Sequence, residues 1–288
     1  MTFHPVEPSL RVAPTKVAAG TYVIHEVQHA LGQPLSVYLN SLVIQAAEPV
    51  IVDTGTVRNR TAWLEDVFGL VDPADVRWVF LSHDDADHTG NLAEVMAACP
   101  KAQLVCSWAI TERFANAFEF PLARCRWIND GDSFDAGDRT LVALRPPLYD
   151  SPATRGLFDE DTGVYWAADS FPTPVPGGAA ATSVPQDVAE LDHEFWWNGM
   201  VMFAHHALSP WLSVVDRDWF ASTVDRVQDQ RPTVIASGHS PTITGAGVDQ
   251  ALALARRLPD AEPPPAPDQV VLDHILAASG EPDARPDS

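Results

Sequence analysis

Two histidines and three aspartates crowd into the segment 81–90, which reads LSHDDADHTG. Imidazole and carboxylate groups together suit divalent metals such as iron, manganese and zinc. An acidic helix start would also explain the aspartates, because carboxylates cap helices and favour their N-termini. That alternative does not explain His83 and His88 at the two ends of the run. Without a cation, Asp84, Asp85 and Asp87 would also repel each other, so we predict that the segment binds metal ions.

This segment lies where a predicted buried strand meets a predicted helix. Val76–Leu81 is an apolar run of the kind found in buried strands, and it leads directly into Ser82 and His83. Gly90–Ala98 has apolar residues spaced for one helical face, and Pro100 follows it. We therefore expect the metal-binding residues in a loop that a strand and a helix hold from both sides.

Strand and helix patterns alternate along the rest of the chain. Apolar and β-branched runs predict further strands at Thr21–Val27, Ser36–Gln45, Pro49–Val52, Gln103–Cys106, Arg126–Asn129, Thr140–Leu144, Gly156–Phe158, Gly163–Ala167 and Thr233–Ser237. Periodic apolar residues predict helices at Arg60–Leu70, Ile110–Phe118, Phe195–Leu208, Trp219–Val227, Val248–Leu258 and Val270–Ala277. Two halves, each rich in strands and then in helices, predict a mixed α/β sandwich with helices outside two sheets. We assign residues 1–258 to this domain, and residues 259–288 to a proline-rich linker and a C-terminal tail with a disordered end.

Composition narrows the classes of partner. The 288 residues include 18 lysines and arginines against 39 aspartates and glutamates, a formal net charge of −21. Such an acidic chain repels nucleic acid and anionic lipid, so we expect neither as a partner. We find no apolar stretch long enough to span a bilayer and no signal-peptide pattern at the N-terminus. Three cysteines in apolar surroundings suit a reducing compartment, so we expect a cytoplasmic protein.

The order of the motifs resembles a known family. A strand, then Asp53-Thr54-Gly55, a helix, a strand and the pattern H-x-D-x-D-H are similar to the metallo-β-lactamase superfamily, which implies a four-layer αββα sandwich. That superfamily usually has a histidine where Asp85 stands. A carboxylate at this position resembles the diiron branch, which comprises the flavodiiron proteins and their flavin-free oxygen-binding relatives.

Three later segments resemble the same branch. Residues 130–137, DGDSFDAG, are similar to its D-G-D-x-x-D-x-G turn. Ala168-Asp169-Ser170-Phe171 resembles the segment whose aspartate bridges the two metals, and Ser237-Gly238-His239 resembles the last ligand segment. The resemblance covers residues 20 to 245 and is specific for the fold and for metal binding, but much less so for the reaction.

The resemblance implies two metal ions and seven ligands, which are also the expected catalytic residues. One metal would be held by His83, Asp85 and Asp150, the other by Asp87, His88 and His239, and Asp169 would lie between them. The family has a histidine at the position of Asp150, which precedes Asp169 by nineteen residues, 169 − 150. Tyr149 is the rival ligand, and a plain surface turn is the alternative because serine and proline follow. Four carboxylates make an oxygen-rich set that favours iron, with zinc or manganese as alternatives.

Other candidates are less specific. Asp53 would either orient a ligating histidine or cap the following helix. His25 and His29 lie near the first strands, where the diiron relatives carry a pocket histidine, so either could face a substrate. His205 and His206 lie in an aromatic helix that more often belongs to a core, although it could line a lid. The proline- and glycine-rich loop 171–185 is expected to cover the site.

Three functions remain open from the sequence. The first is a non-haem diiron protein that binds or reduces dioxygen or a similar small oxidant, with electrons from a redox partner protein because we expect no flavin domain. The second is a binuclear hydrolase of an ester, lactone or phosphate bond, in which two metals activate a bridging hydroxide. The third is a binding module with an empty site. Relatives in the diiron branch commonly pair head to tail, so the resemblance also points to a homodimer.

Overall fold

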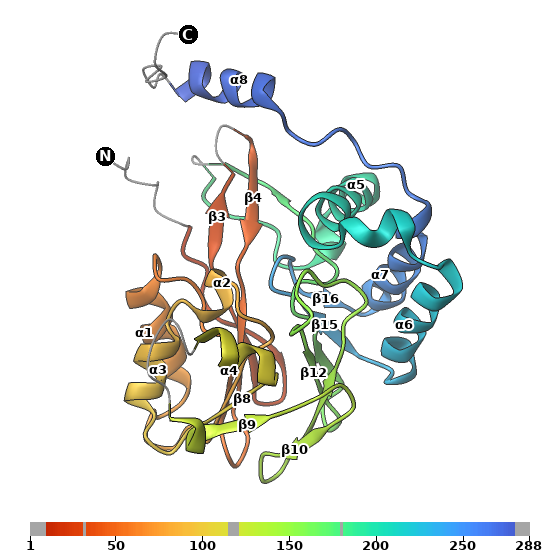
Figure 1. Cartoon of the computed structure of the whole chain (residues 1–288). Helices are drawn as coiled ribbons and strands as arrows, with labels where there is room; N and C mark the ends of the chain where they lie inside the picture. The colour runs from red at the N-terminus through yellow and green to blue at the C-terminus, as the bar shows by residue number, and fades with distance from the viewer. Residues whose placement is uncertain (1–9, 31–32, 115–120, 179–180, 280–288) are drawn as a thin grey trace.

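Two β-sheets lie face to face in the computed structural model, and helices cover the outer side of each (Figure 1). The structure describes residues 10–30, 33–114, 121–178 and 181–279. Apolar side chains from both sheets, among them Val52, Phe80 and Trp166, fill the space between the sheets. The predicted four-layer αββα sandwich is therefore the observed fold.

The first sheet comes from the N-terminal half. Its spatial order is β1 (Thr15–Ala18), β2 (Thr21–Ile24), β5 (Ser41–Ile44), β6 (Val50–Val52), β7 (Trp78–Phe80), β8 (Gln103–Cys106) and β9 (Cys125–Trp127). Strands β6 to β9 run parallel, and the others pair antiparallel. Its outer face carries α1 (Arg60–Leu70), α3 (Leu92–Ala98) and α4 (Trp108–Phe114), with the one-turn helix α2 (Ala86–Thr89) near one end and a short 3₁₀ turn at Leu122–Arg124. The buried Trp63 and Val67 of α1 pack in the core cluster that this sheet shares with its helices.

The second sheet comes from the C-terminal half. Its order is β10 (Ser133–Asp135), β11 (Thr140–Leu144), β12 (Gly156–Asp159), β13 (Val164–Trp166), β15 (Val234–Ala236) and β16 (Ile243–Thr244). Helices α5 (His193–Phe203), α6 (Arg217–Asp229) and α7 (Ala246–Arg257) cover it, with 3₁₀ turns at Val188–Glu190, Pro210–Val214 and Leu258–Asp260. Strands β13 and β15 are parallel, so their carboxyl ends lie at the same edge. A small third sheet joins β14 (Val175–Pro176), β4 (Leu35–Tyr38) and β3 (Val27–His29).

The predicted long strand Ser36–Gln45 is two strands in two different sheets. The chain leaves the small sheet after β4 and enters the first sheet at β5, and Asn40 lies at the break. The Asn40 side chain donates hydrogen bonds to the carbonyls of Ser237 and Ser240, both at 2.9 Å. The strand therefore breaks at Asn40, where the chain passes between the two sheets and the Asn40 side chain holds a loop of the C-terminal half.

The predicted helix Phe195–Leu208 also divides, because α5 ends at Phe203 and a π-helical turn covers Ala204–Leu208. The turn's His205 lies 2.9 Å from the carbonyl of Leu258, and His206 lies 2.6 Å from that of Pro264. The start of the predicted linker is thus fixed to the body of the protein. The domain boundary at residue 258 stays a prediction.

The C-terminal helix is longer than predicted: α8 spans Gln269–Ser279. It lies apart from the helices of the sandwich (Figure 1). The predicted end of helix Ile110–Phe118 and the predicted disordered tail lie outside the described residues. Within the described ranges, no helix is long and apolar enough to cross a membrane.

Candidate metal centre

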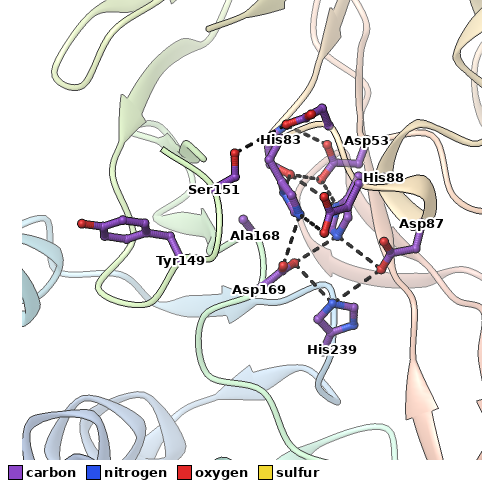
Figure 2. Close-up of polar contacts among 12 residues, drawn as sticks. Asp53, His83, Asp87, His88, Tyr149, Ser151, Ala168, Asp169 and His239 are labelled. Atoms are coloured by element: carbon purple, nitrogen blue, oxygen red, sulfur yellow. Dashed lines mark hydrogen bonds and ion pairs between the residues drawn. The ribbon is translucent and has the colours of Figure 1, made fainter. Parts of the chain in front are cut away.

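The predicted ligands meet where strands of both large sheets end. The segment after β7 carries His83 and Asp85 in a loop and Asp87 and His88 in α2, the loop after β13 carries Asp169, and the loop after β15 carries His239. Parallel strands bring their carboxyl ends to one edge, so ligands far apart in sequence become neighbours. Figure 2 shows the side chains of His83, His88 and Asp169 directed toward one another.

All seven predicted ligands fall into three groups of metal-binding type. Within each group the candidate ligand atoms lie within 4.8 Å of one another. The groups are His83, His88 and Asp169; Asp87, His88 and His239; and His83, Asp85 and Asp150. His83 and His88 each belong to two groups, so the three groups form one continuous cluster.

Asp169 is the centre of this cluster. Its Oδ2 lies 3.2 Å from Nε2 of His83, and its Oδ1 lies 3.0 Å from Nε2 of His88 and 3.4 Å from Nε2 of His239. Oδ2 of Asp87 is 3.5 Å from Nε2 of both His88 and His239 (Figure 2). The Asp169 carboxylate therefore stands between the two predicted ligand sets, each oxygen facing a different side.

The outer nitrogen of each imidazole has an acceptor. Nδ1 of His88 is 2.9 Å from Oδ2 of Asp53, and Nδ1 of His239 is 2.9 Å from the carbonyl of Tyr38. Nδ1 of His83 is 3.0 Å from Oγ of Ser82, whose own hydrogen goes to Asp53. A neutral ring that donates from Nδ1 has its lone pair on Nε2, so all three lone pairs point into the cluster.

Asp53 holds two of these rings from behind. Its Oδ2 accepts from Ser82 Oγ at 2.7 Å and from Trp166 Nε1 at 3.0 Å, and its Oδ1 accepts from the Ser82 amide at 2.8 Å. Asp53 is fully buried and has φ of 56°, a left-handed conformation that costs free energy in a residue other than glycine. Helix α1 begins at Arg60 after Asn59, so the alternative role of Asp53 as its cap is excluded.

Three polar atoms at the centre lack hydrogen bonds. Nε2 of His83, Nε2 of His88 and Oδ1 of Asp169 are buried and make none within the described residues. Buried polar atoms without partners are costly, and a shared cation would satisfy all three. The residues therefore fit the two metal ions that the resemblance implies.

The close approach of imidazoles and carboxylates also shifts the pKa values of these residues. Burial lowers the pKa of His88, but the carboxylates of Asp169, Asp87 and Asp53 outweigh it and hold that pKa well above its ordinary value. Burial also lowers the pKa of His239, but the carboxylates of Asp169 and Asp87 outweigh it and raise that pKa to about 9. Burial raises the pKa of Asp169, but the three imidazoles reverse this and hold it well below its usual range. Protons on the histidines thus take the place of positive charge that metal ions would bring.

Asp150, and not Tyr149, reaches the cluster. Asp150 belongs to a group with His83 and Asp85, and its pKa is raised by desolvation and then by the nearby charge of Asp169. The ring of Tyr149 points away from the cluster and lies 5.1 Å from that of Trp211 (Figure 2). The remaining acid of the motif, Asp84, pairs with Arg113 at 2.6 Å instead.

The other candidate histidines lie elsewhere. Both ring nitrogens of His25 are engaged, one 3.0 Å from Oδ1 of Asn40 and the other 3.0 Å from Oγ1 of Thr15. His25 therefore supports the residue that holds the His239 loop and does not face a substrate. Nδ1 of His29 lies 2.8 Å from Oγ of Ser36. His205 and His206 hold the C-terminal segment, as described above.

The sequence patterns missed the residues that support the ligands. Ser82 lies beside His83, so the motif itself could have suggested it, but Trp166 and the Tyr38 carbonyl have no local signal. Glu26 is also unpredicted: it is 2% exposed and accepts a 2.7 Å hydrogen bond from Thr56. Burial raises its pKa. The predicted covering loop contacts the site where the Thr173 amide donates to the carbonyl of His239 at 2.9 Å.

Comparison with known proteins agrees with this geometry. The family model described as ODP family beta lactamase matches residues 37–239. The chain is 26% identical to diflavin flavoprotein A 1 of Synechocystis sp. over 133 residues, which are 46% of this chain and 23% of that protein. It is 23% identical to the anaerobic nitric oxide reductase flavorubredoxin of Salmonella typhi, again over 46% of this chain and over 28% of that protein. Among solved structures, the rubredoxin oxygen:oxidoreductase of Desulfovibrio gigas superposes with a TM-score of 0.69 at 15% identity, covering 87% of this chain and 62% of that one.

These matches confirm the predicted relationship to the metallo-β-lactamase superfamily and its diiron branch. They also correct one prediction. The expectation that no flavin domain takes part was wrong, because the matched relatives are named as a diflavin flavoprotein and a flavorubredoxin. The chain spans about a quarter of the length of these curated relatives.

Proposed function

The chain belongs to the ODP family of beta lactamases, and from this premise we propose that it is a binuclear non-haem iron protein that binds or reduces a small oxidant. The names of its relatives point to dioxygen and nitric oxide as the two candidate oxidants. We assign one iron to His83, Asp85 and Asp150, the other to Asp87, His88 and His239, and the shared position to Asp169.

One observation carries this proposal: the Nε2 atoms of three histidines converge on the Asp169 carboxylate, and those of His83 and His88 are buried there without a hydrogen-bond partner among the described residues. Four carboxylates complete the set. Hard oxygen donors mixed with imidazole suit iron or manganese, whereas zinc sites in proteins are dominated by nitrogen and sulfur. The donor set thus favours redox chemistry over hydrolysis.

The residues of the chain keep the cluster ready for cations. Asp53 and Ser82 hold His83 and His88 by their outer nitrogens, so neither ring has to turn when a metal binds. Trp166 and Tyr38 are fully buried. The hydrogen bond from Trp166 to Asp53 and that between His239 and the Tyr38 carbonyl are therefore shielded from water. Iron at this position would supply the one-electron steps that reduction of a small oxidant needs, and a flavin-containing partner is the proposed source of the electrons. The homodimer expected from the sequence stays a prediction.

Hydrolysis has less support. The relatives are named as a reductase and an oxidoreductase, and four carboxylates lower the Lewis acidity of the metals they bind. A weaker Lewis acid activates a bridging hydroxide and polarises an ester less well. We therefore keep hydrolysis only as an outcome of the test.

The test is the metal content of the protein, expressed in iron-supplemented medium and purified without added metal. We expect two irons per chain, and a loss of iron from Asp169→Ala. Protein reduced with dithionite in the absence of air should then consume dioxygen or nitric oxide, measured with an electrode, and Asp169→Ala should not. Two zinc ions with turnover of a generic ester would overturn the proposal in favour of hydrolysis. Protein that binds no metal would overturn it in favour of a binding module.

A further inference from the structure

Two buried serines hold the loop that carries Asp150. The amide of Leu148 donates to Oγ of Ser170 at 2.9 Å, and that hydroxyl donates back to the Leu148 carbonyl at 2.9 Å. Ser209 makes the same pair of hydrogen bonds with Tyr149, the residue after Leu148. Its hydroxyl accepts from the Tyr149 amide at 3.0 Å and donates to the Tyr149 carbonyl at 3.2 Å. Each serine thus satisfies both backbone groups of one residue, as a neighbouring strand would.

Trp211 adds a second donor to the same carbonyl. Its Nε1 lies 3.1 Å from the oxygen of Tyr149, and its ring lies 5.1 Å from the Tyr149 ring. The guanidinium of Arg145 also lies over the Tyr149 ring, 4.9 Å from its centre. Tyr149 is therefore fixed in both backbone and side chain, with its ring directed away from the cluster (Figure 2).

The chain after Asp150 is held as well. The carbonyl of Pro152 accepts from Arg145 at 3.0 Å and from Arg155 at 3.2 Å, and the Arg155 amide donates to the Ser82 carbonyl at 2.8 Å. Asp150 thus lies between two fixed backbone segments, and its carboxylate extends from them toward His83 and Asp85.

The residues that hold Tyr149 come from a distant and unusual element. Ser209 directly follows the π-helical turn Ala204–Leu208, and its amide donates to the Ala204 carbonyl at 2.7 Å. π-Helical turns are rare and often occur at functional sites. Here the turn ends α5 so that Ser209, which is fully buried, and Trp211 face the Asp150 loop.

We propose that Ser209 and Trp211 are positioning residues for Asp150, which act by fixing Tyr149 so that the neighbouring carboxylate stays in place to hold one metal ion. This inference rests on the proposed function, in which Asp150 is a ligand. It explains why α5 ends in a π-helical turn and why the Tyr149 ring points away from the cluster. Loss of either contact should weaken the metal held with His83 and Asp85, and leave the metal held with Asp87 and His239 unchanged.

The experiment is a titration of the metal-free protein with Co²⁺, followed by calorimetry and by the visible absorption of the bound ion. Wild type should bind two ions in two steps, and Asp150→Asn should lose one step. Ser209→Ala and Trp211→Phe should each weaken that same step about 10- to 100-fold. Ser209→Thr keeps a hydroxyl that can donate and accept, so it should restore the step. Trp211→Phe keeps the aromatic ring, which preserves a usable variant should Ser209→Ala fail to fold.

A matched control is Ser41→Ala. Ser41 is also a buried serine bonded to a tryptophan, at 2.7 Å from Trp63 Nε1, but it lies on β5 away from the Asp150 loop. This variant should keep both steps, and weakening of the Asp150 step in it would show a general loss of stability and overturn the positioning role. If Asp150→Asn binds both ions as wild type does, the proposed ligand set is wrong. If Asp150→Asn loses a step while Ser209→Ala and Trp211→Phe do not, the positioning role alone is wrong.

Discussion

Oδ2 of Asp53 lies 2.9 Å from Nδ1 of His88, behind the ring and away from the cluster centre. The same carboxylate reaches His83 through the hydroxyl of Ser82. One buried acid therefore sets the tautomer of two histidines, and its strained backbone is the energetic cost of that arrangement.

Replacing Asp53 should weaken metal binding without removing a ligand. In Asp53→Asn the side chain keeps its size but loses its charge, and an amide nitrogen would face at least one of the four donors whose hydrogen bonds the Asp53 carboxylate accepts. We expect the affinity for divalent metal to fall about 10- to 100-fold, measured by competition with a chelator of known affinity. Asp75→Asn, a change at an exposed acid, should leave the affinity unchanged. Equal affinities in wild type and Asp53→Asn would contradict the role assigned to Asp53.

Two glycines offer a contrasting pair. A Cβ at Gly238 would lie 3.1 Å from Cε1 of His88 and 3.3 Å from Oδ1 of Asp169, so one ligand or the other must move by a few tenths of an ångström. Gly238→Ala should therefore lower metal occupancy, measured as metal per chain after dialysis. Gly69 lies in α1 with nothing within 4 Å of its Cβ position, so Gly69→Ala should keep full occupancy and stabilise the fold by about 0.5–1 kcal/mol. The comparison fails if both variants, or neither, lose metal.

We predict that the lowered pKa of the buried His25 makes the folded protein less stable in acid. Burial lowers its pKa to about 4, although the hydrogen bond with Asn40 partly opposes this. Between that value and the unfolded value near 6.5, the unfolded chain binds the proton and the folded chain does not. Stability should thus fall by about 3 kcal/mol as the pH drops from 6.5 to 4, and His25→Gln should lose that part of the slope. Urea unfolding at several pH values measures it, with the exposed His193→Gln as the control that should keep the wild-type slope.

Much of the site could be predicted from local sequence, because four of its ligands lie within six residues. The other three could be predicted only through the resemblance, since Asp150, Asp169 and His239 stand in segments that look like ordinary turns by themselves. The choice between Asp150 and Tyr149 depended on side-chain direction. Ser209 decides that direction from sixty residues away, and no local pattern contains it.

The fold was predictable where pattern and packing agree. Helix α1 and strand β8 have the predicted bounds, because α1 buries Trp63 and Val67 on one face and β8 is a short apolar run buried on both faces. The two strands in Ser36–Gln45 were predicted as one, since the apolar pattern continues across a break that only a tertiary contact of Asn40 explains. The π-helical turn after α5 was missed for a similar reason: its hydrogen bonds to the C-terminal segment, and not its composition, distinguish it from the α-helix before it.

Metal removal should loosen the site and leave the rest of the fold intact. Each metal ion that binds only the folded chain, at a concentration one hundred times its dissociation constant, stabilises it by about 2.7 kcal/mol, which corresponds to roughly 5–8 °C in Tm. We expect treatment with a chelator to lower Tm by this amount for each ion removed and to speed amide hydrogen exchange in the loops that carry Asp150, Asp169 and His239. Exchange in α1 should change little, because its Trp63 and Val67 are buried in a core cluster away from the ligands. Asp169→Ala should already show the lower Tm, and the chelator should not lower it further. A chelator effect of equal size in Asp169→Ala and wild type would mean that the stabilising ion binds elsewhere.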